Sequence, residues 1–446
     1  MVGRWSLAVF AVSLCGGCFG GSEQTIRAYN ALGRATHLDL DVDGYIVGIE
    51  KYPRKAIAEG PAQTYPDRFR KRENGADERL IKTQNKEFVS ATDDRKAMLV
   101  THVVAYFPTR TYLYNAYAAS IKGDLNYRKG YEDGIAVLRN DLKARLLRAI
   151  DDGAPYSHIV LMSMGWNNDQ HVSIDRYNRI MRNLKTVAAG EPDAGFRPLV
   201  IGLTWPSAWF SIEDFWLKKK LLGHLGSYTN KSNDADEIGY TIANWLMNHE
   251  LAQLREELTP AHFPTVVAIG HSLGARLLSR ALFSRPHLRD GPAADPDSVV
   301  TLYLGLQGAF SARRFVPDDS GEGAPYADYK SLSTRIVLTA SEHDRANPSA
   351  FWSKHAGGPN GLAYMRRHPE TFSVLAWETQ KPLIAQALRD DHRPRTVLTI
   401  DVSDIVTGPD AHNDILDTEL AEVIWFCLRQ VEQPPTADAS ETAGGP

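Results

Sequence analysis

The chain has 446 residues, 43% of them hydrophobic, and its 50 basic and 54 acidic side chains leave a formal net charge of −4. This near balance provides no electrostatic basis for nucleic-acid binding, so we expect no nucleic-acid partner. The body of the chain contains no run of about 20 apolar residues, which argues against a transmembrane helix there.

Residues 1–18 have the pattern of an export signal. Arg4 precedes the short apolar segment 5–14, and small residues lead to Cys18. A basic residue, an apolar core and small residues are typical of a secretory signal peptide. The same residues resemble a bacterial lipoprotein cleavage site, although Cys15 stands where a leucine-like residue is usual. We expect a protein of the bacterial cell envelope, lipid-anchored through Cys18 and so attached to a membrane surface, or secreted. The alternative is an ordinary apolar N-terminus.

The segments that flank the central part differ from it in composition. Residues 19–35 are predicted to be a linker, and residues 433–446, rich in Pro, Ala, Gly, Ser and Thr, a disordered tail. Residues 36–96 form an N-terminal extension, in which alternation around Asp43-Gly44 predicts a β-hairpin. Cys427, the third cysteine besides Cys15 and Cys18, lies in an apolar context and is predicted to be a buried thiol. No disulfide framework follows from these three cysteines.

The central residues 97–432 alternate between short apolar runs and segments with helical spacing. Short buried strands that alternate with helices predict an α/β fold, with a mostly parallel sheet and helices on both faces. The predicted strands are 99–107, 158–164, 198–204, 265–269, 299–306, 335–340 and 396–402, and the predicted helices are 135–151, 174–188, 238–254, 275–282 and 414–430.

The most informative motif is the pentapeptide Gly-His-Ser-Leu-Gly at residues 270–274, which lies between a predicted strand and a predicted helix. A serine in this setting, with glycine two residues to either side, is typical of a nucleophile elbow. The turn imposes a strained backbone on Ser272, and the helix N-terminus directs amide N–H groups at charge that develops beside it. The alternative is a structural turn, because the pentapeptide pattern also occurs by chance.

A candidate acid follows the predicted strand 335–340. Functional side chains of an open parallel sheet lie beyond the C-terminal ends of its strands. This strand runs into Ser-Glu-His-Asp, in which Asp344 is the candidate acid and Glu342 the fallback. The alternative for Asp344 is a loop or helix-capping role.

A candidate base follows the last predicted strand. His412 lies in a loop with Gly and Pro, just before the last helix, whereas His392 and His355 are less well positioned. Ser272, Asp344 and His412 together supply the nucleophile, the acid and the base that nucleophilic catalysis requires. His412 would take the serine proton and return it to the leaving group, while Asp344 would fix the imidazole tautomer and stabilise the imidazolium.

An oxyanion hole needs two amide donors. The amide of Leu273, directly after the nucleophile, is the first candidate. The second candidate is the amide of Trp166, because Gly165 lets the loop after strand 158–164 turn close to the substrate. The alternative for this loop is a plain turn built on Gly and Asn.

These motifs together resemble the α/β-hydrolase superfamily. Over roughly residues 97–430 the chain is similar to a little-characterised bacterial branch of esterase-like serine hydrolases, with Ser272 and the Trp-Pro-Ser run its most specific parts. The departure is Met164, where that branch has histidine, which leaves the backbone donor unaffected. The counterparts of the branch's motifs are Met164-Gly165-Trp166-Asn167, Trp205-Pro206-Ser207, Gly270–Gly274, Ser341-Glu342-His343-Asp344 and His412.

The segment 208–222 combines aromatic residues with three lysines just past a strand end. It is expected to be a lid over the active site, an element that rests on a membrane surface, or a packed surface helix.

We predict a serine hydrolase that cleaves carboxylic esters of small molecules or lipids through an acyl-enzyme on Ser272. The alternative is a non-catalytic cell-envelope binding protein that keeps the fold. No cofactor is expected. No metal site is predicted, because the chain has no His-x-x-x-His motif and no cysteine pair beyond the expected export signal.

Overall fold

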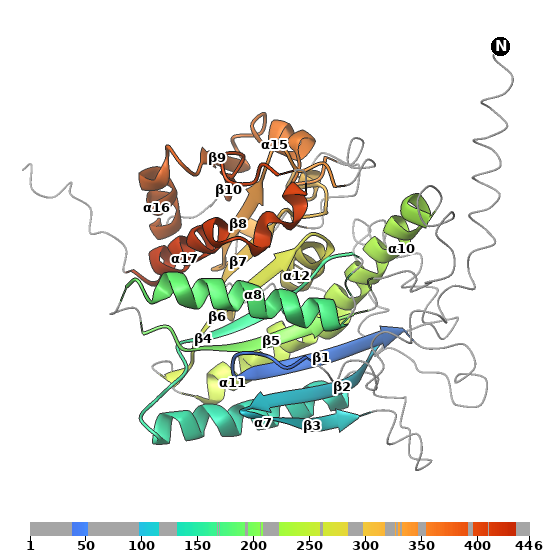
Figure 1. The fold of residues 1–446 in the computed structure, drawn as a ribbon, viewed down its shortest axis with the longest axis vertical. Helices are drawn as coiled ribbons and strands as arrows, with labels where there is room; N and C mark the ends of the chain where they lie inside the picture. Colours follow the sequence, from blue (N-terminus) through green and yellow to red (C-terminus); the bar gives the residue numbers. More distant parts are fainter. Residues whose placement is uncertain are drawn as a thin grey trace, which may run out of the picture.

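Ten β-strands form one sheet at the centre of the computed structural model (Figure 1). The structure describes residues 38–51, 98–115, 132–166, 168, 170–191, 195–205, 207, 223–258, 262–283, 298–316, 326, 329–330, 332–346, 354–390, 396–408 and 410–433. The strands are β1 (Gly44–Lys51), β2 (Met98–Phe107), β3 (Thr109–Asn115), β4 (His158–Ser163), β5 (Pro198–Thr204), β6 (Thr265–His271), β7 (Val300–Leu306), β8 (Arg335–Ala340), β9 (Phe372–Ala376) and β10 (Val397–Asp401).

The strand order is β3-β2-β1-β5-β4-β6-β7-β8-β10-β9. Strand β2 pairs antiparallel with β1 and β3, and every other neighbouring pair is parallel. The predicted α/β fold with a mostly parallel sheet is therefore confirmed, and the sheet is consistent with that of an α/β-hydrolase. The strands β6, β8 and β10 run in the same direction, so their C-terminal ends lie on the same side of the sheet.

Helices cover both faces of the sheet, as predicted. Successive strand residues point to opposite faces, so in β4 Ile159 and Leu161 join one apolar core while Val160 and Met162 join the other. The first core includes side chains of α7 (Glu132–Asp151), α10 (Gly223–Ile238), α11 (Leu251–Glu257), α12 (Leu273–Phe283) and α15 (Pro359–Met365). The second includes side chains of α8 (Gln170–Ala188), α16 (Lys381–Arg389) and α17 (Thr418–Glu432).

The predicted hairpin at Asp43-Gly44 is wrong. Residues 44–51 form the single strand β1, which lies between β2 and β5 and so belongs to the same sheet as the central residues. The carbonyl of Asp43 accepts a hydrogen bond from the Val200 amide at 3.0 Å. A Cβ on Gly44 would come within 2.3 Å of the Val200 carbonyl oxygen. The glycine is thus required by the close approach of β5 rather than by a turn.

The predicted helix 238–254 is part of a longer helical segment that includes two π-helical turns, η4 (Gly239–Ala243) and η5 (Leu246–Glu250). A Cβ on Gly239 would lie 2.5 Å from the Leu277 carbonyl oxygen, so the glycine allows α12 to cross closely here.

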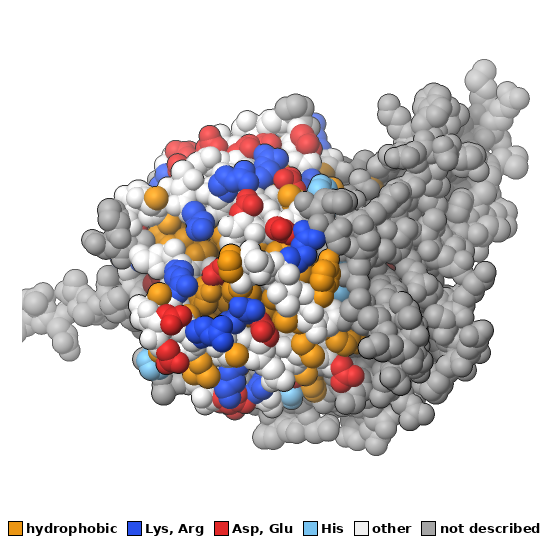
Figure 2. Space-filling model, turned by 60° about the horizontal axis from the view of Figure 1, so that its bottom comes forward, with side chains coloured by type: hydrophobic (Ala, Val, Ile, Leu, Met, Phe, Trp, Pro, Cys, Tyr) orange, Lys and Arg blue, Asp and Glu red, His pale blue; other side chains and the backbone are white. Residues whose placement is uncertain are grey.

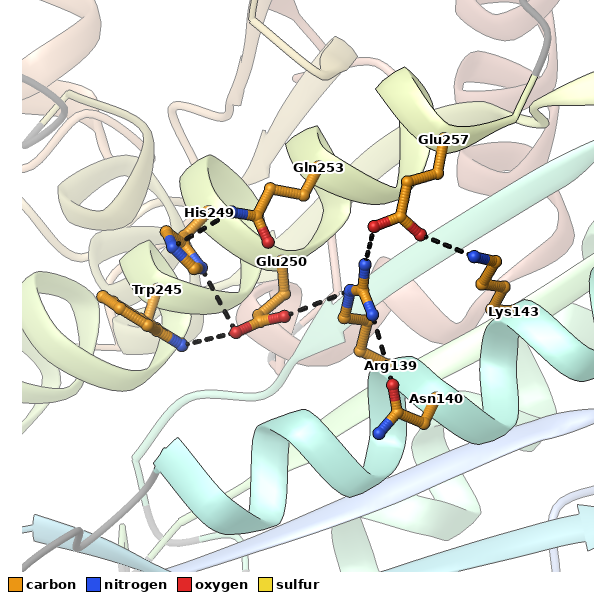
Figure 3. A network of polar contacts seen from close by, with 8 residues as sticks. All are labelled: Arg139, Asn140, Lys143, Trp245, His249, Glu250, Gln253 and Glu257. Atoms are coloured by element: carbon orange, nitrogen blue, oxygen red, sulfur yellow. Dashed lines mark hydrogen bonds and ion pairs between the residues drawn. The ribbon is translucent and has the colours of Figure 1, made fainter.

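A polar network joins this segment to α7 (Figure 3). Glu250 accepts hydrogen bonds from Trp245 Nε1 at 2.9 Å and from His249 Nδ1 at 3.2 Å, and it pairs with Arg139. Arg139 and Lys143 of α7 both pair with the Glu257 carboxylate. Burial opposes ionisation of Glu250, but hydrogen bonds and charge from His249, Trp245 and Arg139 outweigh it and lower its pKa. The bond between the Trp245 and Glu250 side chains joins residues five positions apart, as the backbone hydrogen bonds of a π-helix do.

The surface shown in Figure 2 carries both signs of charge. Lys and Arg side chains alternate with Asp and Glu side chains around apolar areas. On the described part of that face, no large area carries a single sign of charge.

A fully buried histidine, His102 of β2, lies opposite Gly48 of β1. A Cβ on Gly48 would fall 2.0 Å from its ring, so the glycine makes room for it. His102 Nε2–H donates to Gln170 Oε1 at 3.0 Å, and Thr101 Oγ1 lies 3.0 Å from its Nδ1. Burial lowers the pKa of His102 to about 4.

This histidine predicts a loss of stability in acid. The unfolded chain protonates His102 near the ordinary histidine pKa of 6.5, whereas in the folded chain the ring resists protonation down to about pH 4. Neutral His102 therefore stabilises the folded chain above pH 6.5. This stabilisation, about 3 kcal/mol of the free energy of unfolding, is lost as the pH falls toward 4. We expect His102→Gln to remove most of that difference in urea unfolding measured at pH 7 and pH 4.5. The control is His171→Gln, which should leave the pH dependence nearly unchanged because His171 is exposed on α8. Equal pH dependence in wild type and His102→Gln would contradict the prediction.

Candidate active site

Ser272 occupies a sharp turn between β6 and α12. Its φ of 56° lies in the left-handed region, which side chains other than glycine rarely adopt. Its amide donates to the Leu306 carbonyl at 3.1 Å, and its carbonyl accepts from the Ala309 amide at 3.0 Å. The end of β7 and the loop that follows it thus hold the strained backbone of Ser272.

Two glycines permit this turn because strand and helix approach closely. A Cβ on Gly274 would lie 2.0 Å from the Ser163 carbonyl oxygen. A Cβ on Gly270 would lie 2.5 Å from the Cα of Ala275. The first turn of α12 therefore packs directly against the end of β4, and Leu273 is fully buried in that turn.

Asp344 and His412 meet beyond the C-terminal ends of two adjacent strands, β8 and β10. His412 lies in the 3-10 helix η9 (Ala411–Leu416), and its Nδ1–H donates to Asp344 Oδ2 at 2.9 Å. The Asp344 side chain is 6% exposed and that of His412 is 21% exposed. A carboxylate that accepts from Nδ1 leaves Nε2 of the same ring as the proton acceptor.

The structure also describes two of the other candidates from the sequence, Glu342 and His355. Glu342, the fallback acid, is 54% exposed and pairs with Arg366 at 2.9 Å. The backbone of His355 bridges to Ser311, and its side chain is buried. His392 lies outside the described residues. Among the described candidates, the structure brings Asp344 to His412 and turns Glu342 toward Arg366.

The residue before Ser272, His271, links this turn to His412. His271 Nε2–H donates to the His412 carbonyl at 2.9 Å, and the two ring centroids are 4.6 Å apart. The turn that carries Ser272 and the 3-10 helix that carries His412 are therefore adjoining segments.

The loop after β4 lies directly against Ser272. A Cβ on Gly165 would be 2.4 Å from Ser272 Cβ and 2.8 Å from its Oγ, so only glycine fits without displacement. The side chain of Asn168 donates to the carbonyls of Gly165 and Trp166 at 2.9 and 3.0 Å. The bond to the Gly165 carbonyl also orients the Trp166 amide, because both belong to the same planar peptide group.

The end of β5 braces the same loop. Ser207 Oγ accepts from the Asn168 amide at 3.0 Å and donates to the Asn168 carbonyl at 2.6 Å. Trp205 Nε1 donates to the Met164 carbonyl at 3.0 Å. Sequence reasoning misses these roles of Asn168, Ser207 and Trp205. The Trp-Pro-Ser run is the available signal, but the run alone does not indicate which loop its side chains contact.

Several predicted features lie outside the described residues. These are the export signal with Cys15 and Cys18, the linker, the segment 208–222 and the tail beyond residue 433. Cys427 is buried, and burial raises the pKa of its thiol well above the usual range.

Metal ligands and membrane spans were sought among the described residues. Within these ranges, no group of three or more His, Cys, Asp or Glu side chains has an arrangement that would hold a metal ion. No described helix has both the length and the apolar character needed to cross a membrane.

No family model, curated protein or solved structure matches this chain.

Proposed function

We propose that this chain is a serine hydrolase of the α/β-hydrolase type, which cleaves carboxylic esters through an acyl-enzyme on Ser272. The observation that carries the proposal is the 2.9 Å bond between His412 Nδ1 and Asp344 on the segment next to the strained turn of Ser272. A strained serine, a histidine of defined tautomer and a buried carboxylate along one sheet edge are the parts that this chemistry requires.

The proposed reaction has two halves. Ser272 Oγ attacks the ester carbonyl while His412 Nε2 takes its proton, and the negative oxygen is stabilised by the amides of Leu273 and Trp166. Collapse of this intermediate breaks the bond to the alcohol, which receives the proton from His412. Water then attacks the acyl-enzyme by the same route and releases the acid. Asp344 stabilises the imidazolium form of His412 in both halves.

The substrate is an ester of a small molecule or a lipid. Thioester, amide and acyl-transfer reactions would use the same residues, so ester cleavage is the specific part to be tested. The alternative, a binding protein that keeps the fold without catalysis, requires Ser272 to be unreactive.

A fluorophosphonate probe and p-nitrophenyl esters of short and long acyl chains test the proposal. We expect the probe to label Ser272, and Ser272→Ala to lower kcat by at least about 1,000-fold. The matched control is Ser298→Ala, because Ser298 is also buried but lies before the N-terminal end of β7, opposite the candidate site. Absence of labelling in folded protein would reject the serine hydrolase and favour the binding protein. Hydrolysis that survives Ser272→Ala would reject Ser272 as the nucleophile.

A further inference from the structure

His271 is a buried histidine for which the proposed reaction has no chemical role. It is the last residue of β6 and directly precedes Ser272, and its side chain is 1% exposed. A histidine at a strand end can be a simple core residue, so its contacts decide whether it does more.

The contacts of His271 determine its tautomer. A carbonyl oxygen only accepts hydrogen bonds, so the 2.9 Å contact with the His412 carbonyl requires a proton on His271 Nε2. Its Nδ1 is buried and has no hydrogen-bond partner among the described residues. Burial, together with the charges of His412 and Arg176, holds the pKa of His271 well below its usual range. The ring is therefore a neutral donor whose single N–H bond goes to His412.

His412 is consequently held at two points. Its side chain donates to Asp344 at 2.9 Å, and its backbone carbonyl accepts from His271 at 2.9 Å. The two histidine rings also contact each other, with planes inclined at 46°. η9 is a short 3-10 helix, and the hydrogen bonds of such a helix have poorer geometry than those of an α-helix. Asp344 orients the ring, but it does not tie the backbone of this helix to the nucleophile.

We infer that His271 is a positioning residue that fixes the backbone of His412 relative to Ser272. This inference rests on the proposed function. His271 joins the strand that carries the nucleophile to the helix that carries the base. A change in the His271 contact therefore alters the distance over which the proton must move. The ring stays neutral and adds no positive charge beside the imidazolium that forms on His412. The cost of this arrangement is a buried Nδ1 of His271 without a hydrogen-bond partner in the described part of the chain.

Two substitutions of similar shape separate the hydrogen bond from the packing. His271→Gln keeps an N–H near the position of Nε2, whereas His271→Met fills similar volume without a donor. We expect His271→Met to lower kcat at least about tenfold with KM changed less than about twofold. His271→Gln should be about five- to tenfold more active than His271→Met. The matched control is His158→Met. His158 is equally buried, but it is the first residue of β4, at the end of the strand away from the candidate site, and it contacts Ser157 Oγ at 2.7 Å. Its kcat should stay within about twofold of wild type.

A second measurement does not depend on activity. In protein with 15N-labelled histidine, the proton on His412 Nδ1 reports the bond to Asp344. We expect it to exchange with solvent faster in His271→Met than in His271→Gln or wild type. Equal kcat and equal exchange in the Gln and Met variants would overturn the inference, even if wild type proves to be a hydrolase. Wild type without Ser272-dependent hydrolysis would reject the proposed function instead, and the exchange measurement would still decide whether His271 positions His412.

Discussion

Replacement of Asp344 with asparagine is expected to lower kcat for p-nitrophenyl ester hydrolysis about 10,000-fold. The Asp344 carboxylate accepts the Nδ1 proton of His412 at 2.9 Å and so leaves Nε2 free to accept a proton. An asparagine amide in the same place can donate to Nδ1, which stabilises the opposite tautomer of the ring. His412 would then carry its proton on Nε2 and could not take the proton of Ser272. The geometry should be preserved because the two side chains are nearly isosteric.

Glu342→Gln is the matched control for this substitution. It removes the same charge two residues away, from a side chain that is exposed and paired with Arg366. We expect kcat within about twofold of wild type, since an exposed ion pair contributes little. An Asp344→Asn variant that is folded and retains kcat within about tenfold of wild type would show that Asp344 is not the acid of the proposed triad.

Replacement of Asp236 with asparagine is expected to lower the free energy of unfolding by about 3–5 kcal/mol. Asp236 of α10 is fully buried and accepts from Arg276 at 2.6 Å and from both terminal nitrogens of Arg314 at 3.1 Å. Burial opposes its ionisation, but the charges of Arg276, Arg314 and Arg280 lower its pKa well below the usual range. Without the carboxylate, buried guanidinium groups lose the charge that pairs with them.

Urea unfolding measures this loss, and Asp41→Asn is its control. Asp41 pairs with Arg182 at 2.8 Å, but both side chains are about half exposed or more, so the cost should stay below about 1 kcal/mol. Because Arg276 and Arg280 belong to α12, the helix directly after Ser272, thermal inactivation should also begin at a lower temperature. A loss below about 1 kcal/mol in Asp236→Asn would mean that the arginines do not depend on this carboxylate.

Most of the central strands and helices follow from local pattern. The strands 198–204 and 335–340 have the bounds that the sequence predicts, and the turn at Ser272 lies between a strand and a helix as expected. Such segments are readable because periodic apolar side chains reflect which face is buried, whatever the partner. Strands β3 and β9 are not predicted from the sequence. They lie at the two edges of the sheet, where burial imposes less pattern.

The contacts between side chains at the candidate site could not be derived from local pattern. Glu342 and Asp344 follow the same strand and the sequence favours Asp344, but only the tertiary structure shows that Asp344 bonds to His412 while Glu342 pairs with Arg366. The brace of Asn168 by Ser207 joins residues 39 positions apart, and the bond between His271 and His412 spans 141 positions. Contacts between residues so far apart in the sequence depend on the order of the strands in the sheet. A short window of neighbouring residues does not determine that order.

The sequence by itself determined the alternation of strands and helices, the elbow at Ser272 and the candidate residues after later strands. It did so because backbone conformation and burial act within a few residues along the chain. The tertiary structure alone decided that β1 lies between β2 and β5, that Gly44 serves close packing instead of a turn, and which side chains meet at the sheet edge. These outcomes depend on contacts between segments far apart in the chain, where shape, buried charge and hydrogen-bond geometry select one arrangement.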